Sequence, residues 1–72
     1  MLKDEYYRRV ELGQKLRMYR MASELTQKQA AEKLGVNFST VGMWETGKRV
    51  PSTTKLQEIL DLYDVELRMS FR

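Results

Sequence analysis

The stretch from Thr26 to Pro51 constrains the fold more than any other part of the chain, because it carries start and stop signals for two short helices in close succession. Thr26 is a residue type favoured at a helix N-cap, and Gln29 follows three residues later, where a capping box has its second member. Gly35 stands where helices commonly end in a left-handed residue. These signals predict a helix over about residues 26–34. Its apolar face consists of Ala30, Ala31 and Leu34.

A second helix is predicted over about residues 37–46. Asn37 is a favourable N-cap residue and Gly47 marks the end of the helix. Val41 and Trp44 fall four and seven residues after Asn37, on one face. Two helices joined by a tight glycine turn form a helix-turn-helix motif, whose second helix can enter the major groove of DNA.

A further helix is predicted before the motif, from roughly Asp4 or Leu12 to Ala22. Its core-facing stripe is formed by Leu12, Leu16 and Tyr19. The sequence leaves open whether residues 1–11 extend this helix or form a flexible arm. Leu25, directly before the Thr26 cap, is expected to staple the start of the next helix.

A fourth helix is predicted after the loop at residues 47–51. Ser52 or Thr53 would cap it. Its buried face is expected to consist of Leu56, Ile59, Leu60 and Tyr63.

The motif and its flanks also resemble the phage-repressor (Cro/C1, or xenobiotic-response-element) helix-turn-helix family over about residues 12–63. The residues that carry the resemblance are Leu16, Arg17, Arg20, Leu25, Thr26, Gln27, Ala31, Gly35, Val36, Val41, Trp44, Glu45, Gly47, Lys48, Arg49 and Pro51. The resemblance implies an all-α, lambda-repressor-like DNA-binding domain of four to five helices over residues 1–64. It also implies a sequence-specific transcriptional repressor that binds double-stranded DNA as a dimer on a palindromic operator.

The last eight residues change to a two-residue period, in which apolar and polar side chains alternate. This pattern predicts a half-buried strand over residues 65–72 with Val65, Leu67, Met69 and Phe71 on its apolar face. No other segment reads as a strand, so we expect antiparallel pairing with the same strand of a second copy in a homodimer. A frayed or helical tail is the alternative. A helix-turn-helix body that ends in one such strand resembles the HipB-type antitoxin repressors, which implies a toxin protein as a further partner.

The outward face of the second motif helix is expected to read DNA bases through Asn37, Phe38, Ser39 and Met43. The resemblance implies base contacts at the positions of Phe38, Ser39 and Met43. Phe38 and Met43 can pack on thymine methyl groups, and this face carries no Arg, Lys or Gln that could read guanine or adenine with two hydrogen bonds. The sequence therefore predicts readout that favours A·T pairs and depends partly on DNA shape. The alternative is that Phe38 and Met43 belong to a protein-binding surface or to the core.

Phosphate contacts are expected from side chains on both sides of the recognition helix. The first motif helix begins with a glutamine and a lysine, where the helix dipole also favours an anion. The expected contacts are Gln27, Lys28, Thr40, Lys48, Arg49 and Arg17, with Lys15 as an alternative to Arg17. Ahead of Val50 there are ten Lys and Arg against six Asp and Glu, so the positive charge lies with the motif.

Two charged positions need a structural interpretation. The resemblance implies a semi-buried ion pair between Arg20 and Glu45, which would tie the first helix to the end of the recognition helix. Trp44 is interpreted as a core residue rather than a base-stacking one. Gly42 lies inside the recognition helix, where a close approach of DNA or of the preceding helix would explain it.

Composition excludes several other function classes. The 72-residue chain has no Cys and no His, so it lacks the usual zinc ligands and the commonest general base. We therefore expect no metal, no cofactor and no enzymatic activity, and interpret Glu58, Asp61 and Asp64 as a solvated polar face. No apolar run is long enough for a membrane span and no signal peptide is apparent, so a cytoplasmic, nucleoid-associated protein of bacterial or phage origin is expected. The competing interpretation is a protein-interaction module that keeps this fold with little base-specific DNA binding.

Overall fold

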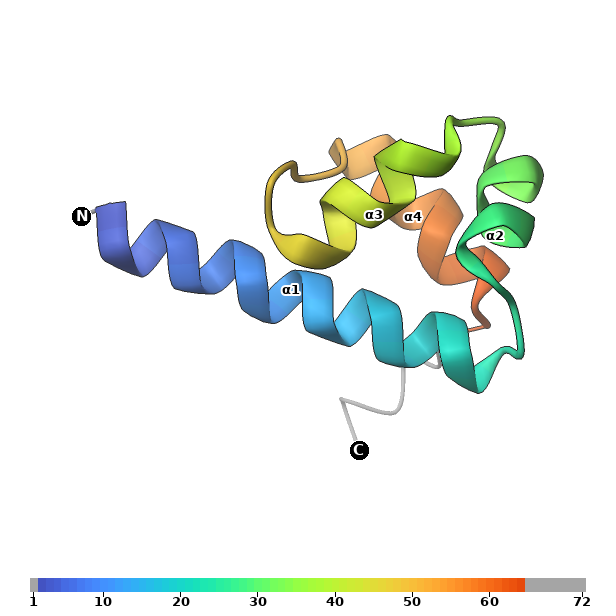
Figure 1. Cartoon of the computed structure of the whole chain (residues 1–72), viewed down its shortest axis with the longest axis horizontal. Coiled ribbons are helices and arrows are strands. Elements are labelled where there is room, and N and C mark those ends of the chain that lie inside the picture. The colour runs from blue at the N-terminus through green and yellow to red at the C-terminus, as the bar shows by residue number, and fades with distance from the viewer. Residues whose placement is uncertain (1, 65–72) are drawn as a thin grey trace.

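The computed structural model describes residues 2–64, with side chains from Asp4 onward, as an arrangement of helices (Figure 1). The helices are α1 (Leu2–Ala22), α2 (Gln27–Leu34), α3 (Phe38–Thr46) and α4 (Thr53–Leu62). The all-α helix-turn-helix fold is therefore confirmed, and the two motif helices begin and end close to where the sequence places them. The predicted strand with Val65, Leu67, Met69 and Phe71 lies outside the described residues.

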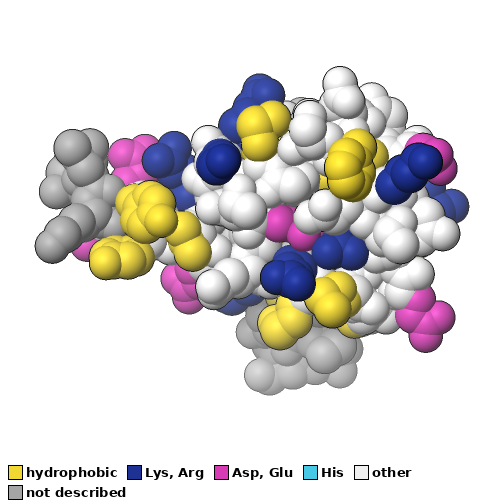
Figure 2. Space-filling model, viewed as in Figure 1, with side chains coloured by type: hydrophobic (Ala, Val, Ile, Leu, Met, Phe, Trp, Pro, Cys, Tyr) yellow, Lys and Arg dark blue, Asp and Glu magenta, His cyan; other side chains and the backbone are white. Residues whose placement is uncertain are grey.

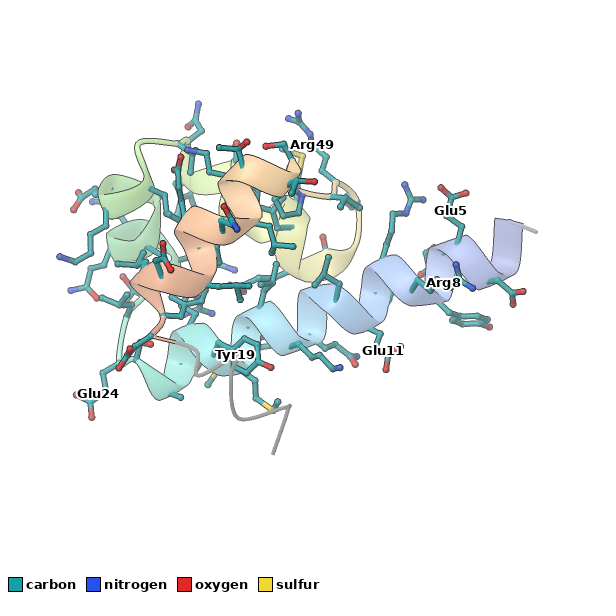
Figure 3. All side chains as sticks on the ribbon, turned by 180° about the vertical axis from the view of Figure 1, so that it is seen from behind. Glu5, Arg8, Glu11, Tyr19, Glu24 and Arg49 are labelled. Carbon is teal, nitrogen blue, oxygen red and sulfur yellow. The ribbon has the colours of Figure 1, made fainter. Side chains whose placement is uncertain are left out.

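Helix α1 takes the longer of the two alternatives that the sequence left open. It begins at Leu2 and runs for 21 residues, so residues 2–11 are helical. The N-terminal part of α1 extends beyond the other helices, while α3 lies against its middle and α2 stands at its far end (Figure 1). Helix α4 lies behind α3 in the same view and covers the back of the domain, which Figure 3 shows in front.

The capping signals of the first motif helix act as predicted. The Gln29 main-chain N–H donates to Thr26 Oγ1 at 3.0 Å, and the Thr26 N–H donates to Gln29 Oε1 at 2.9 Å. Gly35 ends α2 with φ 69°, and Gly47 ends α3 with φ 82°. These left-handed conformations suit glycine because a Cβ would be strained there. Ser52 is the N-cap of α4, and its hydroxyl accepts from the Lys55 N–H at 3.1 Å.

The core lies where the four helices meet and is formed by one apolar stripe from each. Its buried members are Leu16, Ala30, Ala31, Leu34, Val41, Trp44, Ile59 and Tyr63. Leu12 and Tyr19 pack against these residues, as the periodicity predicts, and Leu25 packs against them as well. On α4 the expected Leu60 is only half-buried, and Leu62, in the last turn of that helix, packs against the core instead.

Helices α1 and α3 cross with their backbones in contact. Gly13 is buried, and a Cβ at this position would lie 2.5 Å from the Trp44 carbonyl oxygen and 2.6 Å from that of Glu45. A Cβ at Gly47 would lie 3.1 Å from the main-chain N and Cα of Val10. The last turn of α3 therefore sits directly on α1, and this contact sets the position of the whole recognition helix.

Candidate nucleic-acid interface

Helix α3 has an inner face that packs and an outer face that faces solvent. Val41, at 1% exposure, and Trp44 belong to the core, so Trp44 is a packing residue in this structure. Phe38 is 56% exposed, and Ser39 is exposed beside it. The exposed ring of Phe38 contributes nothing to the stability of the domain, so this position is a candidate for an intermolecular contact.

Three other positions of α3 lie at the border of the two faces. Thr40, Gly42 and Met43 are all half-buried, whereas the sequence pattern predicts an outward position for Met43. The loop after α3 turns back beside this position, where the Lys48 and Arg49 N–H groups donate to the main-chain carbonyl of Met43 at 2.9 and 3.2 Å. Met43 thus presents only part of its side chain to a ligand.

Asn37 occupies the N-cap position of α3, but its side chain does not act as a cap. Its backbone is extended, with φ −70° and ψ 145°, and no capping hydrogen bond is made by the amide. The Thr40 N–H donates instead to the main-chain carbonyl of Asn37 at 3.0 Å. Asn37 is therefore the N-cap residue that the sequence predicts, although its side chain makes no capping bond, and the exposed amide is available for a contact outside the helix.

The ion pair implied by the family resemblance is present at the inner end of α3. Arg20 Nε donates to Glu45 Oε2 at 2.6 Å, and Arg20 Nη2 donates to Glu45 Oε1 at 3.1 Å. Both side chains are buried, with 9% and 3% of their surface exposed. The hydrogen bond to Glu45 raises the pKa of Arg20 above its ordinary value, although burial opposes this. A two-pronged contact of this kind fixes both side chains in one geometry.

The same hydrogen-bond network extends to Leu25 and to helix α2, and its charges also act on Tyr63. Arg20 Nη1 donates to the Leu25 carbonyl at 2.7 Å, and Gln27 Nε2 donates to Glu45 Oε1 at 3.0 Å. Burial, together with the Glu45 carboxylate, raises the pKa of Tyr63 to about 12. A single carboxylate on α3 therefore holds a side chain of α1 and a side chain of α2.

The expected phosphate-binding side chains differ in how free they are. Exposed basic residues are found on α1, on α2 and in the loop after α3, namely Arg17, Lys28, Lys48 and Arg49, and Lys15 is exposed as well. Arg49 points away from the body of the domain (Figure 3). Over the described residues, the ion pairs are Arg20–Glu45 and Lys55–Glu58. The exposed basic residues on these elements take part in neither of these ion pairs and are available to a ligand, whereas Gln27 is already bonded to Glu45.

Basic and apolar side chains share the face of the domain on which α3 lies in front of α4 (Figures 1 and 2). Figure 2 shows the basic side chains spread over this face with apolar side chains between them, rather than gathered in one cluster. A nucleic-acid duplex presents phosphates on both walls of a groove and bases between them, which such a distribution can match. Within residues 2–64, no helix is apolar over the length needed to cross a bilayer, and no group of three or more acidic side chains is placed to hold a metal ion.

Comparison with known proteins identifies the family. A model of the family described as "Helix-turn-helix" matches residues 16–69, which include the whole motif, the ion pair and α4. The chain belongs to the Cro/C1-type helix-turn-helix family. The matched region begins in the middle of α1, so the projecting first turns of that helix lie outside it.

Three relatives are similar to this helix-turn-helix domain. YobD of Bacillus subtilis, named an uncharacterized HTH-type transcriptional regulator, is 41% identical over 54 residues, which is 75% of this chain and 48% of that protein. BcrR of Enterococcus faecalis, named an HTH-type transcriptional activator, is 34% identical over 81% of this chain and 28% of its own length. ImmR of Bacillus subtilis, named an HTH-type transcriptional regulator, is 36% identical over 78% of this chain and 44% of its own. The chain thus spans less than half of each of these relatives.

The sequence did not reveal the contacts that two residues of the site make. No role was predicted for Gly13, although it is where α1 meets the backbone of α3. Gln27 was expected as a free phosphate-binding side chain, although it bonds Glu45. A glycine in the apolar stripe of a helix is a usable signal for a close crossing, but the Gln27–Glu45 contact has no local signal because 18 residues separate its members.

Proposed function

We propose that this helix-turn-helix domain binds double-stranded DNA and regulates transcription, with α3 as the recognition helix in the major groove. The observation that carries the proposal is the outer face of α3, where Phe38 and Ser39 are exposed without any packing role in the domain. The relatives named as transcriptional regulators support the same function. The proposed function is binding, without an enzymatic step, in the cytoplasm at the nucleoid.

The base contacts that we propose come from Asn37, Phe38, Ser39 and Met43. Asn37 and Ser39 have hydrogen-bonding side chains, and Phe38 has exposed ring surface for thymine methyl groups. The half-buried Met43 would contribute a smaller contact. These side chains favour A·T pairs, so replacing thymine by uracil across the bound site should weaken binding, since only the methyl group is removed.

The phosphate contacts that we propose flank these residues on three elements. Lys28 lies on one side of the recognition helix, and Lys48 and Arg49 lie on the other. Arg17 or Lys15 adds a contact from α1, and Thr40 and Gln27 contribute neutral donors. About four ionic contacts per subunit give about eight per dimer, for which log K should fall with log salt concentration at a slope of about −7.

A dimer with the predicted strand of residues 65–72 at its interface would place two recognition helices on half-sites one helical turn apart. Repression of a palindromic operator, and a role as the antitoxin of a toxin–antitoxin pair, are the finer form of the proposal. Because one relative is named an activator, the direction of regulation has to be measured. A chain that ends after Asp64 should keep its helices and lose dimerisation and DNA affinity together; a dimer that survives the cut would place the interface elsewhere.

The experiment that tests the function is selection of bound duplexes from a random DNA pool with the full-length protein at about physiological salt. Enrichment of an inverted repeat with half-sites about ten base pairs apart is expected. Absence of any enriched sequence would reject sequence-specific binding. With the enriched duplex in hand, Arg49→Ala should weaken binding to all sequences alike and flatten the salt slope by about two units per dimer. Lys33→Ala, an exposed charge at the far end of α2, is the matched control and should change neither.

A second candidate function is a protein-interaction module built on the same fold. The exposed Phe38, on a helix face that carries no Arg, Lys or Gln, favours it. In that case the selection would return only salt-sensitive, sequence-independent binding, and Phe38→Ala would abolish binding of the protein partner without changing DNA affinity.

A further inference from the structure

The side chain of Gln27 bridges the two helices of the motif instead of extending freely into solvent. It begins at the first residue of α2 and ends at α3, where Nε2 donates to Glu45 Oε1 at 3.0 Å. That oxygen also accepts from Arg20 Nη2 at 3.1 Å, so the acceptor is itself held in place by a buried guanidinium. The position of the Gln27 amide is therefore set by the buried network and not by solvent.

Gly42 provides the space that this bridge occupies. A Cβ at Gly42 would lie 3.9 Å from both Nε2 and Oε1 of Gln27, which is an ordinary van der Waals distance. The atoms beyond the Cβ of a larger side chain would compete with the amide for the same volume. A Cβ here would have no backbone atom of α2 within 4 Å, so the packing of the two helices does not itself require a glycine. The Gln27 side chain, together with a ligand that approaches from outside, limits the size of the residue at this position.

We propose that Glu45 is a positioning residue for DNA binding, which holds the Gln27 amide so that its second N–H meets a backbone phosphate at the N-terminus of α2. An amide nitrogen carries two N–H donors, and the bond to Glu45 uses one of them. A glutamine that is already ordered loses less conformational entropy when it binds than a free one does. The inference rests on the proposed function and adds a task to a pair that otherwise holds the fold together.

The charge of Arg20 is a necessary part of this arrangement. The Glu45 carboxylate and the proposed phosphate would both accept hydrogen bonds from the same amide nitrogen of Gln27. Two negative charges that are so close together repel each other. Arg20, bonded to both carboxylate oxygens, balances the charge of Glu45 inside the domain. The network thus presents a neutral, fixed donor to the phosphate at the start of α2, where the helix dipole already favours an anion.

A double-mutant cycle tests the inference, with the fluorescently labelled duplex that the wild-type full-length protein enriches from a random pool as the probe. Gln27→Ala should weaken binding about tenfold, the size expected for one hydrogen bond to a charged group. The salt slope should stay unchanged, because a neutral side chain releases no counterion. Glu45→Gln should cost about as much, and the double variant should bind no worse than Gln27→Ala alone.

The opposite results are equally definite. A double variant about a hundredfold weaker than wild type, the product of the two single effects, would show that Glu45 acts on the fold alone and would overturn the inference. If the wild-type protein enriches no duplex, the proposed function fails and the inference falls with it. Gln57→Ala, an exposed glutamine on α4, is the matched control and should bind like wild type.

A second variant keeps the test independent of the stability of Glu45→Gln. Gln27→Asn retains an amide at the start of α2 but shortens the side chain by one methylene, so it cannot reach Glu45. If positioning matters, this variant should bind as weakly as Gln27→Ala. Wild-type affinity in Gln27→Asn would mean that the amide reaches the phosphate without Glu45, and would contradict the proposal.

Discussion

The inner and outer faces of α3 obey different constraints. The inner face carries Val41, Trp44 and Glu45, all buried, and its last turn contacts the backbone of α1 at Gly13. The outer face carries Phe38 and Ser39, which are exposed and support no other element. One short helix therefore separates the residues that fix its position from those available to a ligand, so the outer side chains can be exchanged with little cost to the fold.

Removing the carboxylate of Glu45 should have the largest effect on the inner face. Glu45→Ala would leave Arg20 as a buried charge without its partner, which costs about 3–5 kcal/mol of unfolding free energy. The measurement is urea unfolding followed by circular dichroism. Arg20→Ala is the companion variant, and the double variant should lose clearly less than the sum of the two losses. A loss below about 1 kcal/mol would mean that the pair behaves like a surface ion pair.

Adding a single methyl group should distinguish the two faces most directly. Gly13→Ala should destabilise the domain by about 3 kcal/mol, because its Cβ would lie 2.5 Å from a carbonyl oxygen of α3. Gly42→Ala, the same change at the border between the two faces of α3, should instead stabilise it by about 0.5–1 kcal/mol, since its Cβ fits and alanine favours a helix. Thermal unfolding of both variants gives the comparison, and equal shifts in Tm would refute it.

The pH dependence of the unfolding free energy should report on Tyr63, which is buried in the core. Its pKa is raised from 10.0 to about 12 in the folded domain, so the folded state holds the proton more tightly than the unfolded chain does. The resulting stability is complete below pH 10 and is lost as the pH rises toward 12, by an amount on the order of 2–3 kcal/mol for a shift of this size. Urea unfolding from pH 8 to 12 measures the loss. Tyr63→Phe should remove this component, and an unchanged profile in that variant would assign the loss to other groups.

The smallest contrast concerns the two N-caps of the motif. Thr26→Ala should cost about 1 kcal/mol, because it removes the hydroxyl that accepts from the Gln29 N–H, while the backbone N–H that donates to Gln29 remains. Asn37→Ala should cost only a few tenths, because the Asn37 side chain makes no capping hydrogen bond. Chemical unfolding resolves the difference, while the same Asn37 variant should weaken DNA binding if its amide contacts the duplex. Equal losses of stability would show that Asn37 caps α3 in solution.

Local signals were enough to predict most of the fold. The Thr26 capping box, the two left-handed glycines and the apolar stripe of Leu16 depend on residues close in the sequence, and all three are present. The length of α1 could not be decided, because residues 1–11 contain neither a stop signal nor a clear apolar stripe. Asn37 was correctly placed at the N-cap of α3, but its side chain makes no capping hydrogen bond, because the Thr40 N–H donates to the main-chain carbonyl of Asn37 instead.

The candidate site was less accessible to sequence reasoning. Exposed residues such as Lys28 and Arg49 could be placed from the motif alone, but what Gln27 contacts depends on how α2 crosses α3. The close approach at Gly13 depends likewise on the crossing of α1 and α3. Distances between helices follow from the packing of the whole core, and no pattern within one helix contains them.

The shared carboxylate of Glu45 also has a consequence for how the domain opens. Its hydrogen bonds join residues 25 and 18 positions away in the chain, on two different helices. Helix α3 cannot detach by local fraying without breaking all of them together. Its amide protons should therefore exchange with deuterium only when the whole domain unfolds, so that a helix of nine residues is expected to be as protected as the longest helix beside it.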